Sequence, residues 1–147
     1  MITVRDLLQQ KGNLVWSVQP DDPVLTALNL MTEKDIGALL VMDGAKLRGI
    51  VSERDFVRSI AESRNCLIEA PVSEYMTKVV ITVAPEQTLE DCMQLMTDHH
   101  IRHLPVVEME NIIGVVSIGD IVKADIQEKV SKINTLENYI EGRGFGQ

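Results

Sequence analysis

The chain has 147 residues, 45% of them hydrophobic and 24% charged, a length that suits one compact domain or two small units with a shared core. Its formal net charge of −8 disfavours nucleic acid as a partner, because affinity for phosphates draws on Lys and Arg side chains. No apolar run reaches the length of about 18 residues that a membrane span needs, and the N-terminal residues resemble neither a signal peptide nor a transit peptide. We therefore expect a cytoplasmic protein that binds no nucleic acid and no membrane.

The sequence contains an internal repeat. An offset of 65 residues aligns residues 15–57 with residues 80–122 at 14 identical positions, whereas unrelated segments of ordinary composition would share about three. Because neither copy would bury enough apolar surface alone, we expect the two copies to pack together with pseudo-twofold symmetry. The identical residues of the first copy are Val15, Val18, Pro20, Leu30, Met31, Thr32, Ile36, Leu39, Val41, Gly49, Val51, Ser52, Asp55 and Val57.

Each copy is predicted to form a β-α-β-β-α unit, because short β-branched runs alternate with apolar residues at helical spacing. In the first copy, Asp22 is predicted as the N-cap of a helix with Pro23 at its first position, and Asp43-Gly44 is predicted to form the turn between two strands. The elements expected in chain order are a helical lead-in at 3–9, a strand at 14–18, a helix, strands at 38–42 and 47–51, and a helix from 52 to about 62.

The second copy repeats this order and continues into a longer helix, so the fold class is α+β. We divide the chain into a first repeat with its lead-in helix (1–68), a second repeat (69–128), and a helical extension with a tail (129–147), of which 142–147 is expected to be disordered. The elements expected in the second copy are a helical lead-in at 72–76, a strand at 79–83, a helix, strands at 103–107 and 112–116, and a helix from 117 onward.

Apolar residues recur at helical spacing from Ile118 to Ile140, along the last predicted helix. A stripe of this length exceeds what a small domain can cover, so we expect its outer end to pack against a second subunit in a homodimer. The alternative is an amphipathic helix that folds back on its own domain.

The pattern Ser-x-x-Asp closes the second hairpin strand of both copies, from Ser52 to Asp55 and from Ser117 to Asp120. A Ser N-cap with an acidic residue three positions later forms a capping box, which needs no ligand. The same geometry would also suit a ligand, because a helix N-terminus offers N–H groups to an anion and a carboxylate can accept two hydrogen bonds from a ribose diol. Capping prefers Glu or Gln at this position, whereas both copies carry Asp. The spacing alone still favours the capping box, and we favour the ligand only together with the family resemblance that follows.

These features resemble the cystathionine β-synthase (CBS) domain family, and the resemblance extends over residues 3–128. It implies a regulatory ligand sensor that binds an adenine nucleotide (AMP, ADP, ATP or NAD) or S-adenosylmethionine and controls a partner protein whose identity the sequence does not reveal. The residues that carry it are Val18-Gln19-Pro20, Val83-Ala84-Pro85, the Leu-Met-Thr helix ends, residues 101–107 and both Ser-x-x-Asp endings.

The resemblance also implies two composite sites, in which Ser and Asp come from one repeat and the adenine rests on strands of the other. Because Gly37 and Gly119 stand where the first site has Arg102 and Arg54, we expect the first site to bind phosphates better. The implied first site consists of Ser52, Arg54, Asp55, Thr82, Val83, Arg102, His103 and Pro105. The implied second site consists of Ser117, Asp120, Trp16, Ser17, Val18, Gly37 and Ala38.

The sequence contains no catalytic motif, so we expect no enzyme activity. His99, His100 and His103 are not expected to bind a metal, because the first two end a predicted helix and the third lies on a strand. Cys66 and Cys92 lack C-x-x-C spacing, and we expect reduced thiols, with Cys92 in the core. The alternative function is a dimeric interaction scaffold that binds no ligand.

Overall fold

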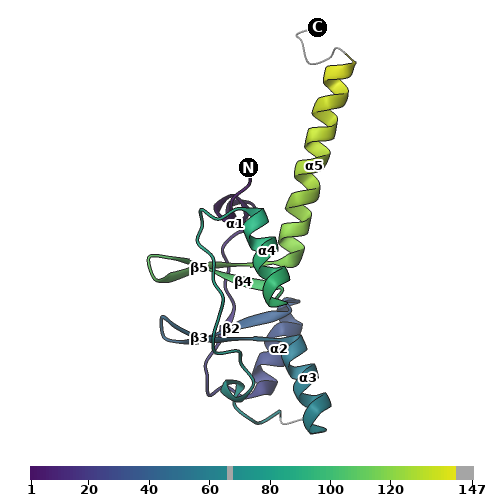
Figure 1. Ribbon diagram of the computed structural model, residues 1–147. Coiled ribbons are helices and arrows are strands. Elements are labelled where there is room, and N and C mark those ends of the chain that lie inside the picture. Colours follow the sequence, from purple (N-terminus) through teal and green to yellow (C-terminus); the bar gives the residue numbers. More distant parts are fainter. Residues whose placement is uncertain (66–67, 142–147) are drawn as a thin grey trace.

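The computed structural model describes residues 1–65 and 68–141 and shows two similar units, one beside the other, whose β-hairpins extend to the same side (Figure 1). This duplicated arrangement confirms the predicted α+β fold. The first unit contains β1 (Ser17–Val18), α2 (Val24–Lys34), β2 (Ala38–Asp43), β3 (Lys46–Ser52) and α3 (Glu53–Ser63). The second contains α4 (Leu89–His99), β4 (His103–Glu108), β5 (Asn111–Ser117) and α5 (Ile118–Ile140). Before the units come α1 (Val4–Lys11) and the 3-10 helix η1 (Val72–Glu74).

The two hairpins pair in the same register. Ala38 pairs with Ser52 across β2 and β3, and His103 pairs with Ser117 across β4 and β5. Since each pair differs from the other by the 65-residue offset of the sequence, the internal repeat holds in three dimensions as well. It brings Ser52 and Ser117 to equivalent places, each at the start of a helix.

The first strand of each copy is shorter than predicted. β1 pairs with β2 in parallel over two residues, and the second copy keeps a single parallel bridge between Val83 and Val106. Parts of the preceding segments, 14–16 and 79–81, line the cavities described below. Only the last one or two residues of the predicted strands 14–18 and 79–83 therefore pair with a neighbouring strand.

The start of α2 differs from the prediction by one residue. Pro23 occupies the N-cap position, and the carboxylate of Asp22 accepts a hydrogen bond from the backbone N–H of Gln19 at 2.8 Å instead. The first N–H groups of α2 need no side-chain cap, because those of Val24 and Leu25 donate to carbonyl groups at Ala70 (2.8 Å) and Ile68 (2.9 Å). Asp22 as N-cap is therefore wrong, because another part of the backbone fills that role.

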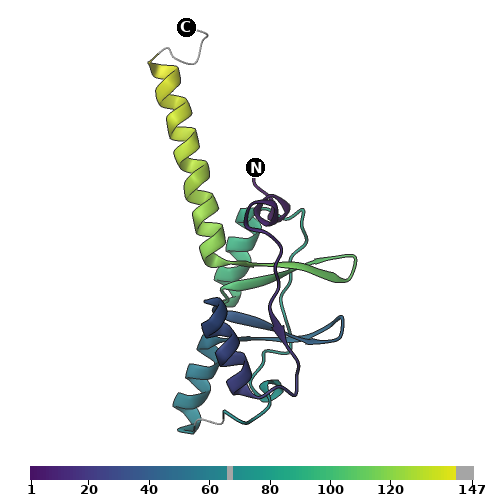
Figure 2. The same ribbon diagram turned by 180° about the vertical axis from the view of Figure 1, so that it is seen from behind.

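The two lead-in segments are exchanged between the units. Val4 of α1 is fully buried in the core of the second unit, whereas Val72 of η1 is buried in the core of the first. Figure 2 shows the chain leaving α1 and crossing to the other unit before it reaches β1. The predicted boundary at residue 68 divides the sequence and stays a prediction. In space, α1 packs on the second repeat although it belongs to the segment 1–68.

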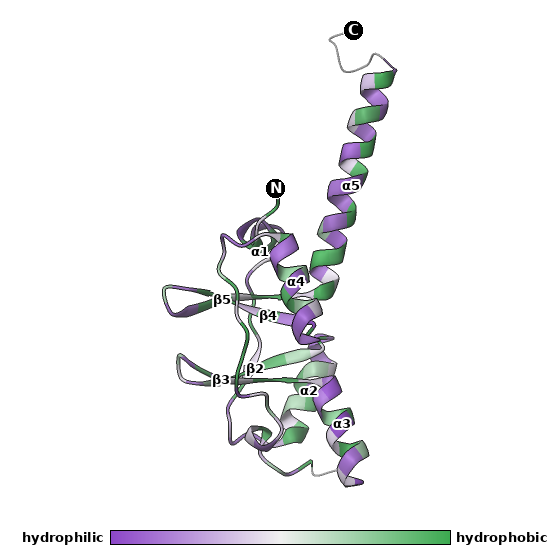
Figure 3. Cartoon of the chain, viewed as in Figure 1, coloured by the Kyte–Doolittle hydropathy of each residue, from purple (hydrophilic) through white to green (hydrophobic). Residues whose placement is uncertain are grey.

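α5 begins in the second unit and projects far beyond it (Figure 1). Ile121 and Ala124 are buried in the core, but the apolar residues that follow them are exposed, among them Ile126 (55%) and Ile133 (54%). Hydrophobic and hydrophilic residues alternate along the projecting part (Figure 3). The helix does not fold back on its own domain, so that alternative is wrong for the part of the chain that the structure describes.

Cys92 lies in the core of the second unit, as predicted, and burial raises the pKa of its thiol to about 11. The expectations for Cys66 and for the tail at 142–147 fall outside the described residues. No helix in the described part of the chain is long and apolar enough to cross a lipid bilayer.

Candidate functional site

Two cavities lie between the units and meet at the middle of the molecule. The larger holds about 430 Å³ and contains the start of α3, and we name it the Asp55 cavity. The smaller holds about 320 Å³ and contains the start of α5, and we name it the Asp120 cavity. Both volumes lie in the range of small-molecule sites. The residues that line both cavities are Gly37, Ile50, His103 and Ser117.

Ser52 ends β3 and caps α3, so the first turn of this helix opens into the Asp55 cavity. The Oδ2 atom of Asp55 accepts hydrogen bonds from the backbone N–H (2.8 Å) and the hydroxyl group (3.0 Å) of Ser52. Ser117 and Asp120 form the same capping box at the start of α5, with 2.8 Å between the Ser117 nitrogen and the Asp120 Oδ2 atom. The predicted capping boxes are therefore present in both copies.

The choice of Asp over Glu does not indicate a ligand, and our inference from it is wrong. Thr3 with Asp6 and Thr88 with Asp91 form the same box at α1 and α4, and neither of those carboxylates lines a cavity between the units. A ligand role for Asp55 depends instead on its second oxygen. Among the described residues no hydrogen bond is donated to Oδ1, so this atom can accept one from a ribose hydroxyl.

Arginine side chains give the Asp55 cavity a local positive charge. Arg54, Arg58 and Arg102 line it, and none of the three forms an ion pair with a carboxylate of residues 1–65 or 68–141. In a chain with a net charge of −8, three unpaired guanidinium groups around one cavity favour an anion there. Guanidinium groups bind phosphate through paired, charge-assisted hydrogen bonds.

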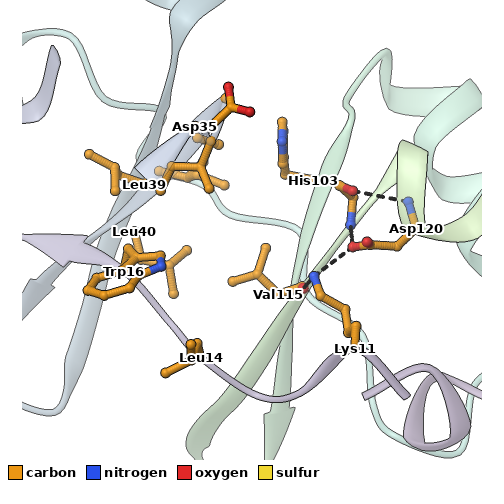
Figure 4. A pocket seen from close by; sticks show the side chains of 14 residues that line it. Lys11, Leu14, Trp16, Asp35, Leu39, Leu40, His103, Val115 and Asp120 are labelled. Atoms are coloured by element: carbon orange, nitrogen blue, oxygen red, sulfur yellow. Dashed lines mark hydrogen bonds and ion pairs between the residues drawn. The ribbon is translucent and has the colours of Figure 1, made fainter. Parts of the chain in front are cut away.

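In the Asp120 cavity the carboxylate is already engaged (Figure 4). The ammonium group of Lys11 lies 2.6 Å from the Oδ2 atom of Asp120 and donates a second hydrogen bond, of 2.8 Å, to the carbonyl oxygen of Val115. Burial alone would raise the pKa of Asp120, but the hydrogen bonds from Lys11 and Ser117 outweigh it and hold the pKa below its ordinary value. The carboxylate of Asp120 is therefore paired with a lysine, whereas that of Asp55 forms no ion pair within residues 1–65 and 68–141.

His103 lines both cavities, and Figure 4 shows it among the side chains of the Asp120 cavity. Burial lowers the pKa of His103, and the positive charges of Lys11 and Arg102 also lower it, against the opposing effects of Asp120 and Glu53. The imidazole is therefore neutral at pH 7, and either of its nitrogen atoms can hydrogen-bond a ligand.

Most of the ligand residues that the resemblance implies line a cavity, and five do not. Those that line the Asp55 cavity are Ser52, Arg54, Asp55, Arg102 and His103. Those that line the Asp120 cavity are Ser117, Asp120, Trp16, Gly37 and Ala38. The five that line neither are Ser17, Val18, Thr82, Val83 and Pro105.

Side-chain alternation explains part of this difference. Val18 turns inward and belongs to a hydrophobic core, as Val83 does, whereas Ser17, the other residue that pairs with β2, turns outward. Pro105 is also buried, and Ser17 and Thr82 are exposed. Residues earlier in each segment line the cavities instead: Leu14 and Trp16 in one, Val79, Val80 and Ile81 in the other.

Two cationic side chains of the cavities were not predicted. Arg58 follows Arg54 by four residues on α3 and therefore lies on the same face, so helical spacing alone could have identified it. Lys11 had no such signal, because its lead-in helix was assigned to the first repeat. Only the exchange of lead-in segments brings it to Asp120.

The histidines do not gather around a metal site. His99 ends α4, and His100 follows it with a φ angle of 55°, whereas His103 begins β4. In the described ranges no three His, Cys, Asp or Glu side chains are placed to hold a metal ion.

The chain is similar to known proteins that contain CBS domains. The sequence profile of the CBS domain matches residues 13–62 and 72–127. The CBS domain-containing protein CBSX3 of Arabidopsis thaliana, described as mitochondrial, is 37% identical over 95% of this chain and 72% of that protein. A CBS-domain protein from Agrobacterium tumefaciens is 37% identical, with a TM-score of 0.81 over 84% of this chain and 98% of that one. The structure of CBSX2 in complex with AMP is 30% identical, with a TM-score of 0.71 over 88% of this chain and 99% of that one.

Proposed function

Because the chain belongs to the CBS domain family, we propose that it is a regulatory protein that binds an adenine nucleotide between its two repeats and catalyses no reaction. Occupancy of the cleft would shift the arrangement of the two repeats, and a partner protein would respond to that shift. The AMP complex of the similar protein CBSX2 supports an adenosyl ligand.

The observation that carries this proposal is the chemistry of the Asp55 cavity. One wall offers the Oδ1 atom of Asp55, which can accept hydrogen bonds from a sugar diol. The opposite repeat contributes Arg102, and α3 contributes Arg54 and Arg58, all without a carboxylate partner in the described part of the chain. A ribose and a phosphate group are the two parts of a nucleotide that such a set of side chains recognises.

The charges also favour some candidate ligands over others. AMP, ADP, ATP and NAD all carry phosphates that can pair with Arg54, Arg58 and Arg102. S-adenosylmethionine carries a sulfonium cation and no phosphate, so the same guanidinium groups disfavour it. We therefore propose a phosphate-bearing nucleotide, with the Asp55 cavity as its primary site.

A thermal-shift series tests the proposal. A ligand at 100 times its dissociation constant adds about 2.7 kcal/mol to the free energy of unfolding, which corresponds to a rise in Tm of about 5 to 10 °C for a chain of this length. AMP, ADP, ATP and NAD should each be compared with S-adenosylmethionine and with inorganic phosphate. If none of the nucleotides raises the Tm, the protein is not a nucleotide sensor, and the interaction scaffold becomes the better candidate.

We further propose that the protein forms a homodimer through the exposed stripe of α5. The stripe consists of Ile118, Val122, Ile126, Val130, Ile133, Leu136 and Ile140, each between 44% and 80% exposed. Leaving this much apolar surface in water is unfavourable, and a second copy presents the same stripe in a form that can match it by twofold symmetry. Light scattering of the purified protein, which gives its molar mass in solution, tests this point.

A further inference from the structure

Lys11 lines the Asp120 cavity and pairs with the carboxylate there that could hold a ribose. It lies at the end of α1 and reaches the cavity because α1 packs on the second unit. Its ammonium group holds the Oδ2 atom of Asp120 at 2.6 Å and the carbonyl oxygen of Val115 at 2.8 Å. This contact joins the first helix of the chain to the candidate ligand carboxylate.

In the part of the chain that the structure describes, the first repeat shows no such cation in the equivalent place. The residue 65 positions before Val115 is Ile50, and its carbonyl oxygen accepts a hydrogen bond of 2.8 Å from the backbone N–H of Thr77. The carbonyl oxygen of Ile50 therefore accepts from a neutral backbone N–H group, whereas that of Val115 accepts from the charged side chain of Lys11. Within residues 1–65 and 68–141, no Lys side chain pairs with Asp55, whereas Lys11 pairs with Asp120.

The two carboxylates differ in which group donates to them. The Oδ2 atom accepts two hydrogen bonds in each: from the N–H and hydroxyl groups of Ser52 at Asp55, and from Lys11 and the N–H of Ser117 at Asp120. Asp55 is therefore held by its own capping residue alone, whereas the charge of Asp120 is paired with a cation that a sugar diol would have to displace. The side chain of Lys11 is 36% exposed, so it has room to swing into solvent when a ligand displaces it.

We propose that Lys11 acts as an internal competitor that weakens binding of a ribose diol in the Asp120 cavity and so makes the two cavities fill in sequence. The inference rests on the proposed function, because it concerns the second site of the same cleft. At low ligand concentration the Asp55 cavity fills alone. The Asp120 cavity fills only when the ligand is concentrated enough to break the pair between Lys11 and Asp120.

The fluorescence of Trp16 can report binding in the Asp120 cavity specifically. Trp16 is the single Trp of the sequence and lines this cavity but not the other. Adenosine is the appropriate probe, because it carries the diol without the phosphates that a cation would attract. The Asp55→Asn variant is the appropriate parent, because it weakens the other cavity while its amide oxygen can still accept the N–H of Ser52.

In this parent, Lys11→Met is expected to tighten adenosine binding by about tenfold, which equals about 1.4 kcal/mol. The fluorescence of Trp16 measures the binding. Lys11→Gln, which removes the charge but keeps a hydrogen-bond donor, is expected to act in the same direction and serves if the Met variant does not fold. Lys11→Arg should leave the affinity near that of the parent, and so should Lys46→Met, which removes an exposed lysine outside both cavities.

Equal or weaker adenosine binding in both neutral variants, or none that can be detected, would overturn the inference. A loss of affinity for AMP in Lys11→Met, with adenosine unchanged, would overturn it as well, because Lys11 would then be a phosphate ligand. Calorimetry of AMP with the unmodified protein separates the two proposals. Binding there upholds the proposed function whatever the Lys11 variants do, and its absence removes the function itself.

Discussion

His103 packs against Gly37 across the middle of the molecule, where a Cβ atom added to Gly37 would lie 3.6 Å from the Cε1 atom of the imidazole. Both residues line both cavities. The internal repeat relates Gly37 to Arg102 and Ala38 to His103. The small residues of the first copy thus leave room for the large, polar residues of the second, and this asymmetry creates a cleft that one ligand or two could occupy.

The size of residue 37 is expected to control both cavities. A methyl group at 3.6 Å is an ordinary van der Waals contact, so Gly37→Ala should keep nucleotide affinity and change the free energy of unfolding by less than about 1 kcal/mol. Gly37→Leu should displace His103 and lower affinity in both cavities by about tenfold or more. Calorimetry with AMP measures the affinities, and unchanged binding by the Leu variant would mean that the ligand lies elsewhere.

The carboxylate of Asp55 is expected to contribute to binding beyond its role as a helix cap. Asp55→Asn should weaken AMP binding by about ten- to a hundredfold, because hydrogen bonds to a charged group contribute about 1.5 to 3 kcal/mol. Asp91→Asn is the matched control, since Asp91 forms the same capping box on α4 but lines no cavity between the units. Equal losses of affinity in the two variants would show that only helix capping had been disturbed.

The sequence alone predicted the duplication and most of the fold. The pairing of Ala38 with Ser52 and of His103 with Ser117 follows the 65-residue offset, because the two copies bury equivalent positions of their hairpin strands, and burial fixes the register. Local patterns failed where a distant segment supplied a hydrogen bond. At α2, the carbonyl group of Ala70 binds the N–H of Val24, and nothing in the sequence around Asp22 indicates it.

The candidate site was predicted less completely than the fold. The Ser-x-x-Asp ends and Arg102 lie in the cavities as expected, because they are attached to well-defined strand and helix ends. Val83 was predicted to line a cavity but does not, because its orientation depends on which residues of an extended segment pair with β4. Lys11 was missed because the two lead-in segments exchange units, a relationship between distant parts of the chain that local patterns do not encode.

Arg102 is expected to recognise the phosphate and not the nucleoside. It lines the Asp55 cavity without an ion-pair partner among the described residues. Arg102→Met should therefore weaken AMP binding by about tenfold, a modest loss because solvent screens the charge of an exposed side chain. Adenosine binding should not change. Arg48→Met, on the hairpin away from both cavities, controls for loss of charge. The AMP affinity of the unmodified protein should also fall with added salt, and a parallel loss for adenosine would contradict a phosphate contact.

Protonation of His103 is expected to destabilise the protein below neutral pH. Its pKa in the folded chain is lowered from the ordinary value of 6.5, so the unfolded chain takes up a proton there more readily than the folded chain. The free energy of unfolding should therefore decrease as pH falls through 6.5 and stop responding to this group below the folded pKa. Urea unfolding at a series of pH values between about 7 and 5 measures the slope.

His103→Gln should remove that part of the pH dependence. The same substitution at His99, in the last turn of α4 and outside both cavities, controls for loss of a histidine. Asp120, Lys11, Arg102 and Glu53 all act on His103, so Lys11→Met should reduce the slope as well. An unchanged slope in His103→Gln would assign the pH dependence to other groups.

The stripe on α5 is expected to hold two subunits together. Ile133 is 54% exposed in the single chain, and burying a side chain of this kind contributes about 1.5 to 3 kcal/mol. Ile133→Glu replaces that contribution with the cost of burying a carboxylate, so the dimer dissociation constant should rise by at least about tenfold. Light scattering over a dilution series measures it. Ser131→Glu places the same charge two residues away, on another side of the helix, and should leave the dimer intact. If both variants keep the molar mass of the unmodified protein at every concentration, or if that protein is itself a monomer, the stripe serves some other contact.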